Sequence, residues 1–142
     1  MRLRELKAHR WLIYGVVGDD DSVAVVDDLI AIRDGNLRAA AAGFVALIDR
    51  CAEFGPHALP DTLSHDVGSG IREFIKGRYR LLYFVVGGAV VVCTHTFMKK
   101  SDKTPNREVS RAVRVKDAYE AAAAAGELEY VRSDDDVLLK VR

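Results

Sequence analysis

Three apolar segments separated by glycine turns follow one another between residues 71 and 97, and this feature constrains the fold more than any other. The segments are IREFIK at 71–76, YRLLYFVV at 79–86 and AVVVCTHTF at 89–97. Their β-branched and aromatic residues are typical of strands. Gly77 lies in the first turn, and Gly87-Gly88 is a two-residue hairpin signal because glycine reaches positive φ without penalty. The pattern predicts an antiparallel meander.

Helical patterns flank this meander on both sides. WLIYGVV at 11–17 indicates a buried strand, and apolar positions then recur at helical spacing over 22–33 and 37–51, which predicts a helical hairpin. Residues 57–70 are expected to be a loop. Thr104 is the expected cap of a last helix that has Pro105 at its first position and ends near Ala125.

The order of these elements predicts the fold class. A strand, two helices, a meander and a helix make a small α+β domain with the helices on one face of an antiparallel sheet, spanning residues 1–126. A chain of 142 residues is long enough to bury a core without disulfides or metals. Residues 127–142 form a tail, for which a short hairpin, a partner-binding arm and disorder all remain open.

The formal net charge of zero hides a strong segregation of charge along the chain. Residues 71–116 contain eleven basic and three acidic residues, whereas the rest of the chain has ten basic and eighteen acidic ones. A local excess of this kind creates a positive field that suits an RNA partner. Solvated faces on strands and a helix are the alternative explanation.

No feature of the sequence indicates a metal, a cofactor or a membrane. Cys51 and Cys93 form no zinc or disulfide pattern and are expected to be buried, reduced thiols. The acidic runs Asp27-Asp28 and Asp134–Asp136 fit helix-start and tail charges better than metal ligands. No apolar run reaches the roughly 20 residues of a membrane span, and no signal peptide is evident, so we expect a cytoplasmic protein.

Three segments together resemble a known protein family. They are LPDTLSHDVGSGIREF, GRYRLLYFVVGG and HTFMKKSDKTPNREVSRA, and they resemble the phage-derived, HigB-like branch of the RelE/HigB toxin superfamily. The matching positions are Leu63, Gly70, Glu73, Arg80, Tyr83, Phe97, Lys99, Lys100, Lys103, Thr104 and Pro105. The resemblance extends from about Trp11 to Tyr119.

The resemblance implies a toxin of a type II toxin–antitoxin pair. Such toxins typically cut mRNA, usually on the ribosome, and are neutralised by an antitoxin that often has a helix-turn-helix domain. The implied activity is a metal-independent endoribonuclease (an mRNA interferase) with no cofactor. The alternative is a catalytically inactive module that retains antitoxin or nucleic-acid binding. It is favoured by Ile75, which stands where the branch usually has arginine.

Metal-free RNA cleavage needs a deprotonated 2′-hydroxyl, stabilisation of phosphate charge, and protonation of the leaving 5′-oxygen. We expect Arg80, Lys99, Lys100 and His95 to be catalytic, with Tyr79 and Leu81 pointing to the sheet face opposite Arg80. The expected RNA-binding residues are Lys76, Arg78, Tyr83, Lys103 and Arg107.

Two of these assignments have structural alternatives. His95, expected on the strand face of Cys93 and Phe97, could instead be a half-buried histidine beside the core. Tyr83 could stack on a base or pack within the sheet. The other histidines, His9, His57 and His65, have no partners that the sequence assembles.

Overall fold

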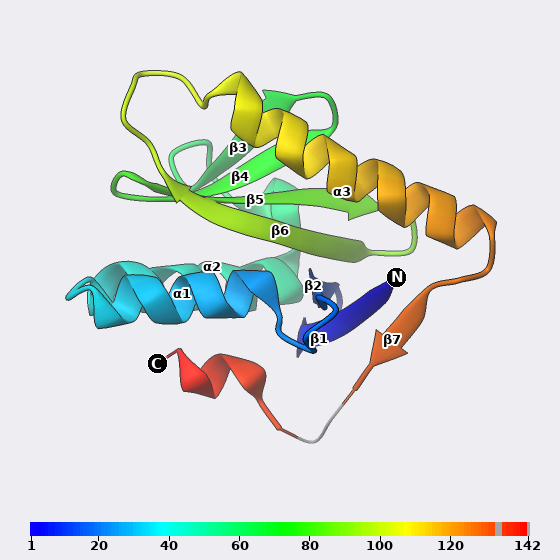
Figure 1. Cartoon of the computed structure of the whole chain (residues 1–142). Helices are drawn as coiled ribbons and strands as arrows, with labels where there is room; N and C mark the ends of the chain where they lie inside the picture. The colour runs from blue at the N-terminus through cyan, green and yellow to red at the C-terminus, as the bar shows by residue number, and fades with distance from the viewer. Residues whose placement is uncertain (133–134, 142) are drawn as a thin grey trace.

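One mixed sheet contains the seven strands of the described part of the chain, in the order β3-β4-β5-β6-β2-β1-β7 (Figure 1). The computed structural model describes residues 1–132 and 135–141, so Asp134 of the predicted acidic run lies outside the described residues. The strands are β1 (Arg2–Ala8), β2 (Leu12–Val16), β3 (Ser64–Gly68), β4 (Ile71–Lys76), β5 (Tyr79–Val86), β6 (Val90–Met98) and β7 (Glu129–Val131). The helices are α1 (Ala24–Asp34), α2 (Arg38–Phe54) and α3 (Asn106–Ala124), with 3-10 turns η1 (Pro56–Ala58) and η2 (Val137–Lys140).

The predicted meander is confirmed as β4, β5 and β6. Both neighbouring pairs are antiparallel, with Leu81 of β5 opposite Phe74 of β4 and Thr96 of β6. Val86 pairs with Val90, so the second turn has three residues and not the predicted two. Strand β2 then pairs with β6 in parallel, which makes the sheet mixed, although most of its pairs are antiparallel.

The helices cover both faces of the sheet, and the prediction that they lie on one face is wrong. Helices α1 and α2 lie below the sheet in Figure 1, and α3 lies above it. Leu81 and Tyr83 belong to the core cluster between the sheet and the pair α1 and α2, which we call the cluster under α1 and α2. Leu82 and Phe84 belong to the cluster between the sheet and α3, which we call the cluster under α3. All four side chains are fully buried, and a strand that is apolar on both faces needs a layer on each.

Within the described residues, no helix is both long and apolar enough to cross a membrane.

Strands β1 and β3 were not predicted, and both have weak apolar patterns. β1 buries Leu3 in the cluster under α3 and Leu6 in the cluster under α1 and α2. A register shift between Glu5 and Lys7 further obscures the alternation of this strand. β3 lies within the predicted loop 57–70, at an edge of the sheet, and pairs with β4 alone.

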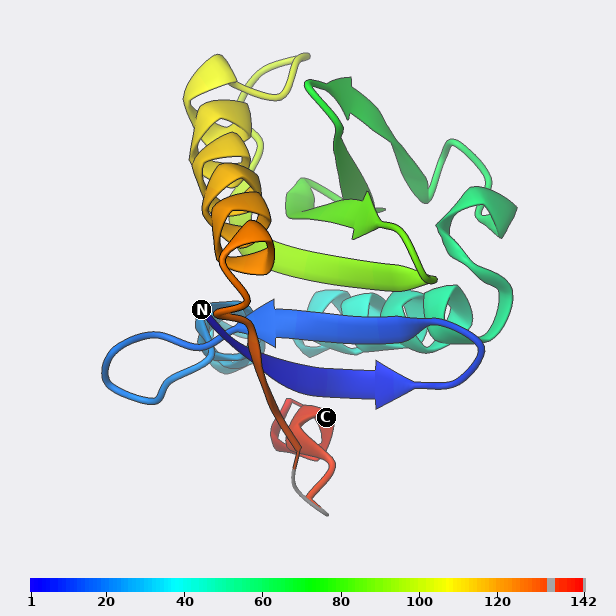
Figure 2. The same ribbon diagram turned by 90° about the vertical axis from the view of Figure 1, so that its right-hand side faces the viewer.

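The described parts of the tail, residues 129–132 and 135–141, pack against the rest of the domain, where the sequence left a hairpin, an arm and disorder open. β7 extends the sheet by pairing in parallel with β1, with Tyr130 opposite Leu3. Figure 2 shows this segment, in orange, running from the end of α3 past the blue N-terminal strand. Farther along, η2 lies against α1, and the guanidinium of Arg33 donates a hydrogen bond to the carbonyl of Lys140. Leu138 is fully buried in the core cluster under α1 and α2.

The adjacent leucines of η2 test whether this segment stabilises the domain. Leu138 is fully buried and Leu139 is 61% exposed. Leu138→Ala should lower the free energy of unfolding by about 2–4 kcal/mol, because it removes buried methyl groups and leaves a cavity. Leu139→Ala should change it by less than about 0.5 kcal/mol. Urea denaturation of both variants makes the comparison, and equal, small effects would show that η2 does not stabilise the folded domain.

Candidate functional site

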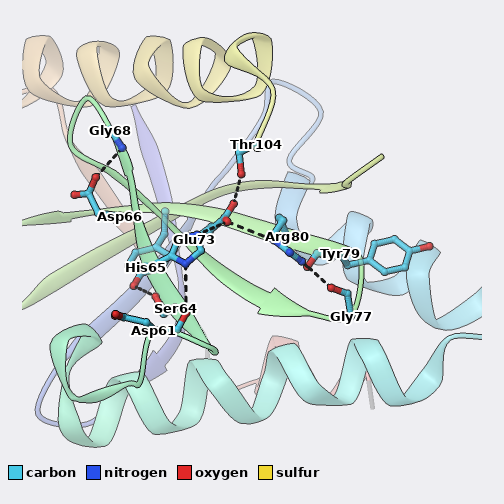
Figure 3. Close-up of polar contacts among 11 residues, drawn as sticks. Asp61, Ser64, His65, Asp66, Gly68, Glu73, Gly77, Tyr79, Arg80 and Thr104 are labelled. Atoms are coloured by element: carbon cyan, nitrogen blue, oxygen red, sulfur yellow. Dashed lines mark hydrogen bonds and ion pairs between the residues drawn. The ribbon is translucent and has the colours of Figure 1, made fainter. Parts of the chain in front are cut away.

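A buried carboxylate, Glu73 of β4, organises the polar residues on the α3 side of the sheet (Figure 3). Its Oε1 accepts a hydrogen bond from Nε2 of His65 at 2.8 Å and lies 3.4 Å from Nε of Arg80. Its Oε2 accepts a hydrogen bond from the hydroxyl of Thr104 at 2.8 Å. We call these four residues the Glu73 cluster. They join β3, β4, β5 and the segment before α3 at one fully buried group.

Arg80 lies deeper than the sequence suggests. Its Nη1 donates hydrogen bonds to the carbonyls of Gly77 and Tyr79 at 2.8 and 2.9 Å, while its Nε faces Glu73. Its side chain is 11% exposed. The prediction that Tyr79 and Leu81 lie on the opposite face is confirmed, because both contribute to the core under α1 and α2. Arg80 therefore compensates a buried charge.

A cationic hollow opens beside Arg80 at the end of the β4–β6 meander. Arg78, Arg80, Lys99 and Lys100 line it together with Gly77, Ser101 and Asp102, and its volume is about 320 Å³. The backbone N–H of Lys99 donates to the carbonyl of Arg78 at 2.7 Å, which fixes the lysine loop to the β4–β5 turn. The loop of Lys99 and Lys100 thus lies beside Arg78 and Arg80. Among the described residues, no acid pairs with Arg78, Lys99 or Lys100.

A second hollow, which we call the histidine hollow, adjoins the first. It has a volume of about 360 Å³ and is lined by residues that include His65, Glu73, Lys99, Asp102, Lys103 and Thr104. Lys99 and Asp102 line both hollows, so the two form one continuous polar surface. The surface places a histidine, a buried carboxylate and several cations near one another.

His95 lies away from this surface. β6 contains a bulge at Thr94, since Leu82 pairs with His95 while the next residue, Tyr83, pairs with Cys93. The bulge places His95 on the α3 face and Cys93 on the opposite face, so the prediction that they share a face is wrong.

The environment of His95 is that of a buried structural residue. Its Nδ1 lies 3.0 Å from the Thr94 hydroxyl, and its Nε2 lies 3.4 Å from Oε1 of Glu108. The residue is only 1% exposed. Burial lowers the pKa of His95, and the positive charge of Arg111 lowers it further, although Glu108 acts in the opposite direction. His95 is therefore held as a neutral imidazole under α3, with no access to either hollow.

Tyr83, Lys76 and Arg107 also lie outside the two hollows. Tyr83 is fully buried, stacks on Phe74 at a centroid distance of 4.2 Å and hydrogen-bonds to Ser64, so its ring has no free face for a base. The stem of Lys76 lies against Gly43 of α2, on the other side of the sheet. Arg107 is exposed in the first turn of α3.

The roles of His65 and Thr104 in this site are not evident from the sequence. His65 acquires its partner because β3 pairs with β4 and sets His65 opposite Glu73, and β3 was expected to be a loop. Thr104 was expected to cap α3, but Pro105 occupies the cap position and the Thr104 hydroxyl binds Glu73. In the sequence, the signal for this site is the family motif that includes Glu73.

The depth of Arg80 predicts a stability effect that Arg78 does not share. Arg80→Ala leaves the Glu73 carboxylate buried without its guanidinium, which should lower the free energy of unfolding by roughly 2–4 kcal/mol. Arg78→Ala, in an exposed turn, should change it by less than about 0.5 kcal/mol. Chemical denaturation followed by circular dichroism measures both, and an Arg80→Ala protein of unaltered stability would contradict this account of the pair.

Comparison with known proteins places the site within a family. The family described as phage derived protein Gp49-like (DUF891) matches residues 36–117, more than half of the chain. The matched region runs from the start of α2 into α3 and includes the Glu73 cluster and the cationic hollow. No curated protein matches the sequence. From the extent of the family match, we conclude that the chain belongs to the phage-derived Gp49-like family.

Proposed function

We propose that this protein is the toxin of a type II toxin–antitoxin system, of the HigB-like branch of the RelE/HigB superfamily, and that it cleaves mRNA on the ribosome. The observation that supports this best is the cationic hollow, in which Arg78, Lys99 and Lys100 lie beside Arg80. Arg80 pairs with Glu73, but among the described residues no acid pairs with the other three cations. Membership of a phage-derived family and the small α+β fold agree with the proposal. Its partners would be mRNA, the ribosome and a cognate antitoxin in the cytoplasm.

The hollow suits the phosphate backbone of a single strand. Lysine and arginine side chains contact phosphate oxygens without reading sequence, and they stabilise the charge that develops as the phosphate is attacked. Arg78, Lys99 and Lys100 are accessible cations of this hollow, and the loop that holds the two lysines is anchored to the β4–β5 turn. Arg80 lies at the inner wall, where its guanidinium pairs with Glu73 and holds this carboxylate in place.

A catalytically inactive binding module is the second candidate. Two observations favour it: Arg80 already uses Nη1 and Nε within the protein, and the apolar Ile75 lies opposite it in the β4–β5 pair. Such a module would keep the antitoxin or nucleic-acid interface and lack cleavage. Activity measurements separate the two candidates.

Induced expression should arrest growth and produce cuts within translated reading frames. Primer extension on translated messages maps these cuts, and co-expression of a small antitoxin encoded beside the gene should abolish them. Full growth and intact messages, with the protein folded and the antitoxin absent, would favour the inactive module.

The two loop lysines should control the salt dependence of RNA binding. Each phosphate contact on a single strand contributes about −0.7 to the slope of log K against log salt. Lys99→Ala/Lys100→Ala should weaken RNA binding and make the slope shallower by roughly 1.4 if both contact phosphate.

A matched double variant controls for charge alone. Arg10→Ala/Arg50→Ala removes two exposed cations outside residues 71–116 and should leave the slope unchanged. Titration of a labelled single-stranded RNA at several salt concentrations makes the comparison. An unchanged slope in the lysine variant would show that the loop is only a solvated basic turn.

A further inference from the structure

His65 occupies a position that the phosphate-binding cations do not explain. It lies on the edge strand β3, lines the histidine hollow with Lys99 and Lys103, and contacts the buried Glu73. We propose that His65 is a catalytic residue, the general acid that protonates the leaving 5′-oxygen. This inference rests on the proposed endoribonuclease function and assigns its proton donor.

Both ring nitrogens of His65 face hydrogen-bond acceptors. Nε2 lies 2.8 Å from Oε1 of Glu73, and Nδ1 lies 3.3 Å from the carbonyl oxygen of Asp61 (Figure 3). A carboxylate and a carbonyl oxygen only accept hydrogen bonds, so only the imidazolium donates to both. The Nδ1 contact is long and lies at the surface, which leaves its proton as the one available for transfer.

The two ring nitrogens of His65 have different surroundings: Nε2 faces the buried Glu73, and Nδ1 lies near the surface. The His65 side chain is 41% exposed, whereas Glu73 is fully buried. The carboxylate therefore holds Nε2 against the protein and orients the ring, in the way that an acidic partner orients a catalytic histidine. A substrate oxygen that entered the histidine hollow could replace the Asp61 carbonyl as the acceptor of the Nδ1 proton.

The histidine lies next to the phosphate-binding cations. His65 and Arg80 both approach Oε1 of Glu73, and Lys99 lines both hollows. A phosphate bound by Lys99 would thus lie between the cations and the imidazole. The charged residues that face His65 or share its hollow are Glu73, Arg80, Lys99, Asp102 and Lys103.

The reaction balances with water as the only other participant. The 2′-oxygen attacks phosphorus and loses its proton to water, and the bond between phosphorus and the 5′-oxygen breaks. The 5′-oxygen takes the proton from Nδ1 of His65. The products are a 2′,3′-cyclic phosphate and a 5′-hydroxyl, and the neutral imidazole then regains a proton from solvent.

A substrate with a better leaving group tests this role. The probe is a short synthetic mRNA that spans a mapped cut, placed on the ribosome, with either the natural 5′-oxygen or a bridging 5′-sulfur at the scissile position. His65→Gln keeps an N–H for Glu73 but has no proton to transfer. It should cleave the natural RNA about 10²–10⁴ times more slowly than the wild type. With the sulfur substrate, whose thiolate leaves without protonation, the loss should be less than about tenfold.

Matched variants control for folding and for the loss of any histidine. His57→Gln, at an exposed position of η1, should cleave both substrates at the wild-type rate. Thermal denaturation tests whether His65→Gln is folded. If this variant does not fold, His65→Asn takes its place in the same comparison.

Three outcomes would overturn the inference, and they are distinguishable. Wild-type cleavage of the natural RNA by folded His65→Gln would remove His65 from the chemistry while leaving the proposed function intact. An equal loss on both substrates would show that His65 acts only on structure or binding. A wild-type protein that cuts neither substrate would overturn the proposed function itself, and the inference with it.

Discussion

The site depends on the burial of one carboxylate, that of Glu73. A fully buried charge is costly unless it is paired and hydrogen-bonded, and here the partners come from three other segments of the chain. Satisfying Glu73 requires β3 to pair with β4, Arg80 to turn inward, and Thr104 to lie over the sheet before α3 begins. The same requirement sets the entrance of α3 and the position of the lysine loop that precedes it. The Glu73 carboxylate therefore both stabilises the local fold and positions the residues of the candidate site.

The sheet around this group is stabilised by apolar burial on both faces. β5 places Leu81 and Tyr83 under the helix pair and Leu82 and Phe84 under α3, so neither layer can be removed without exposing large side chains. β7 adds a strand beside β1, and η2 buries Leu138 against the core that also contains Leu81 and Tyr83. The polar surface lies at the end of the meander, where the β4–β5 turn and the loop after β6 meet. A sheet that is buried on both faces thus positions cations that extend from a turn and a loop.

Elements with strong local patterns were predictable from the sequence, and elements defined by pairing were not. The meander and the helical hairpin have clear strand or helix periodicity, and the loop of Lys99 and Lys100 follows from where the meander ends. β1 and β3 are short of apolar residues, so only their neighbours in the sheet identify them. The bulge at Thr94 shifts His95 to the α3 face, and a bulge leaves no signal in composition. His65 has no partner that can be identified from the sequence, because it meets Glu73 only through the register of the β3–β4 pair.

We propose that this surface cleaves RNA by attack of the 2′-hydroxyl, with protein side chains supplying the charge stabilisation and the proton. The most direct measurement is the chemistry of the new ends produced by the purified protein from a ribosome-bound message. The account predicts 2′,3′-cyclic phosphate and 5′-hydroxyl ends at each cut. Ends with a 5′-phosphate and a 3′-hydroxyl, or a message that stays intact with folded protein and no antitoxin, would contradict it.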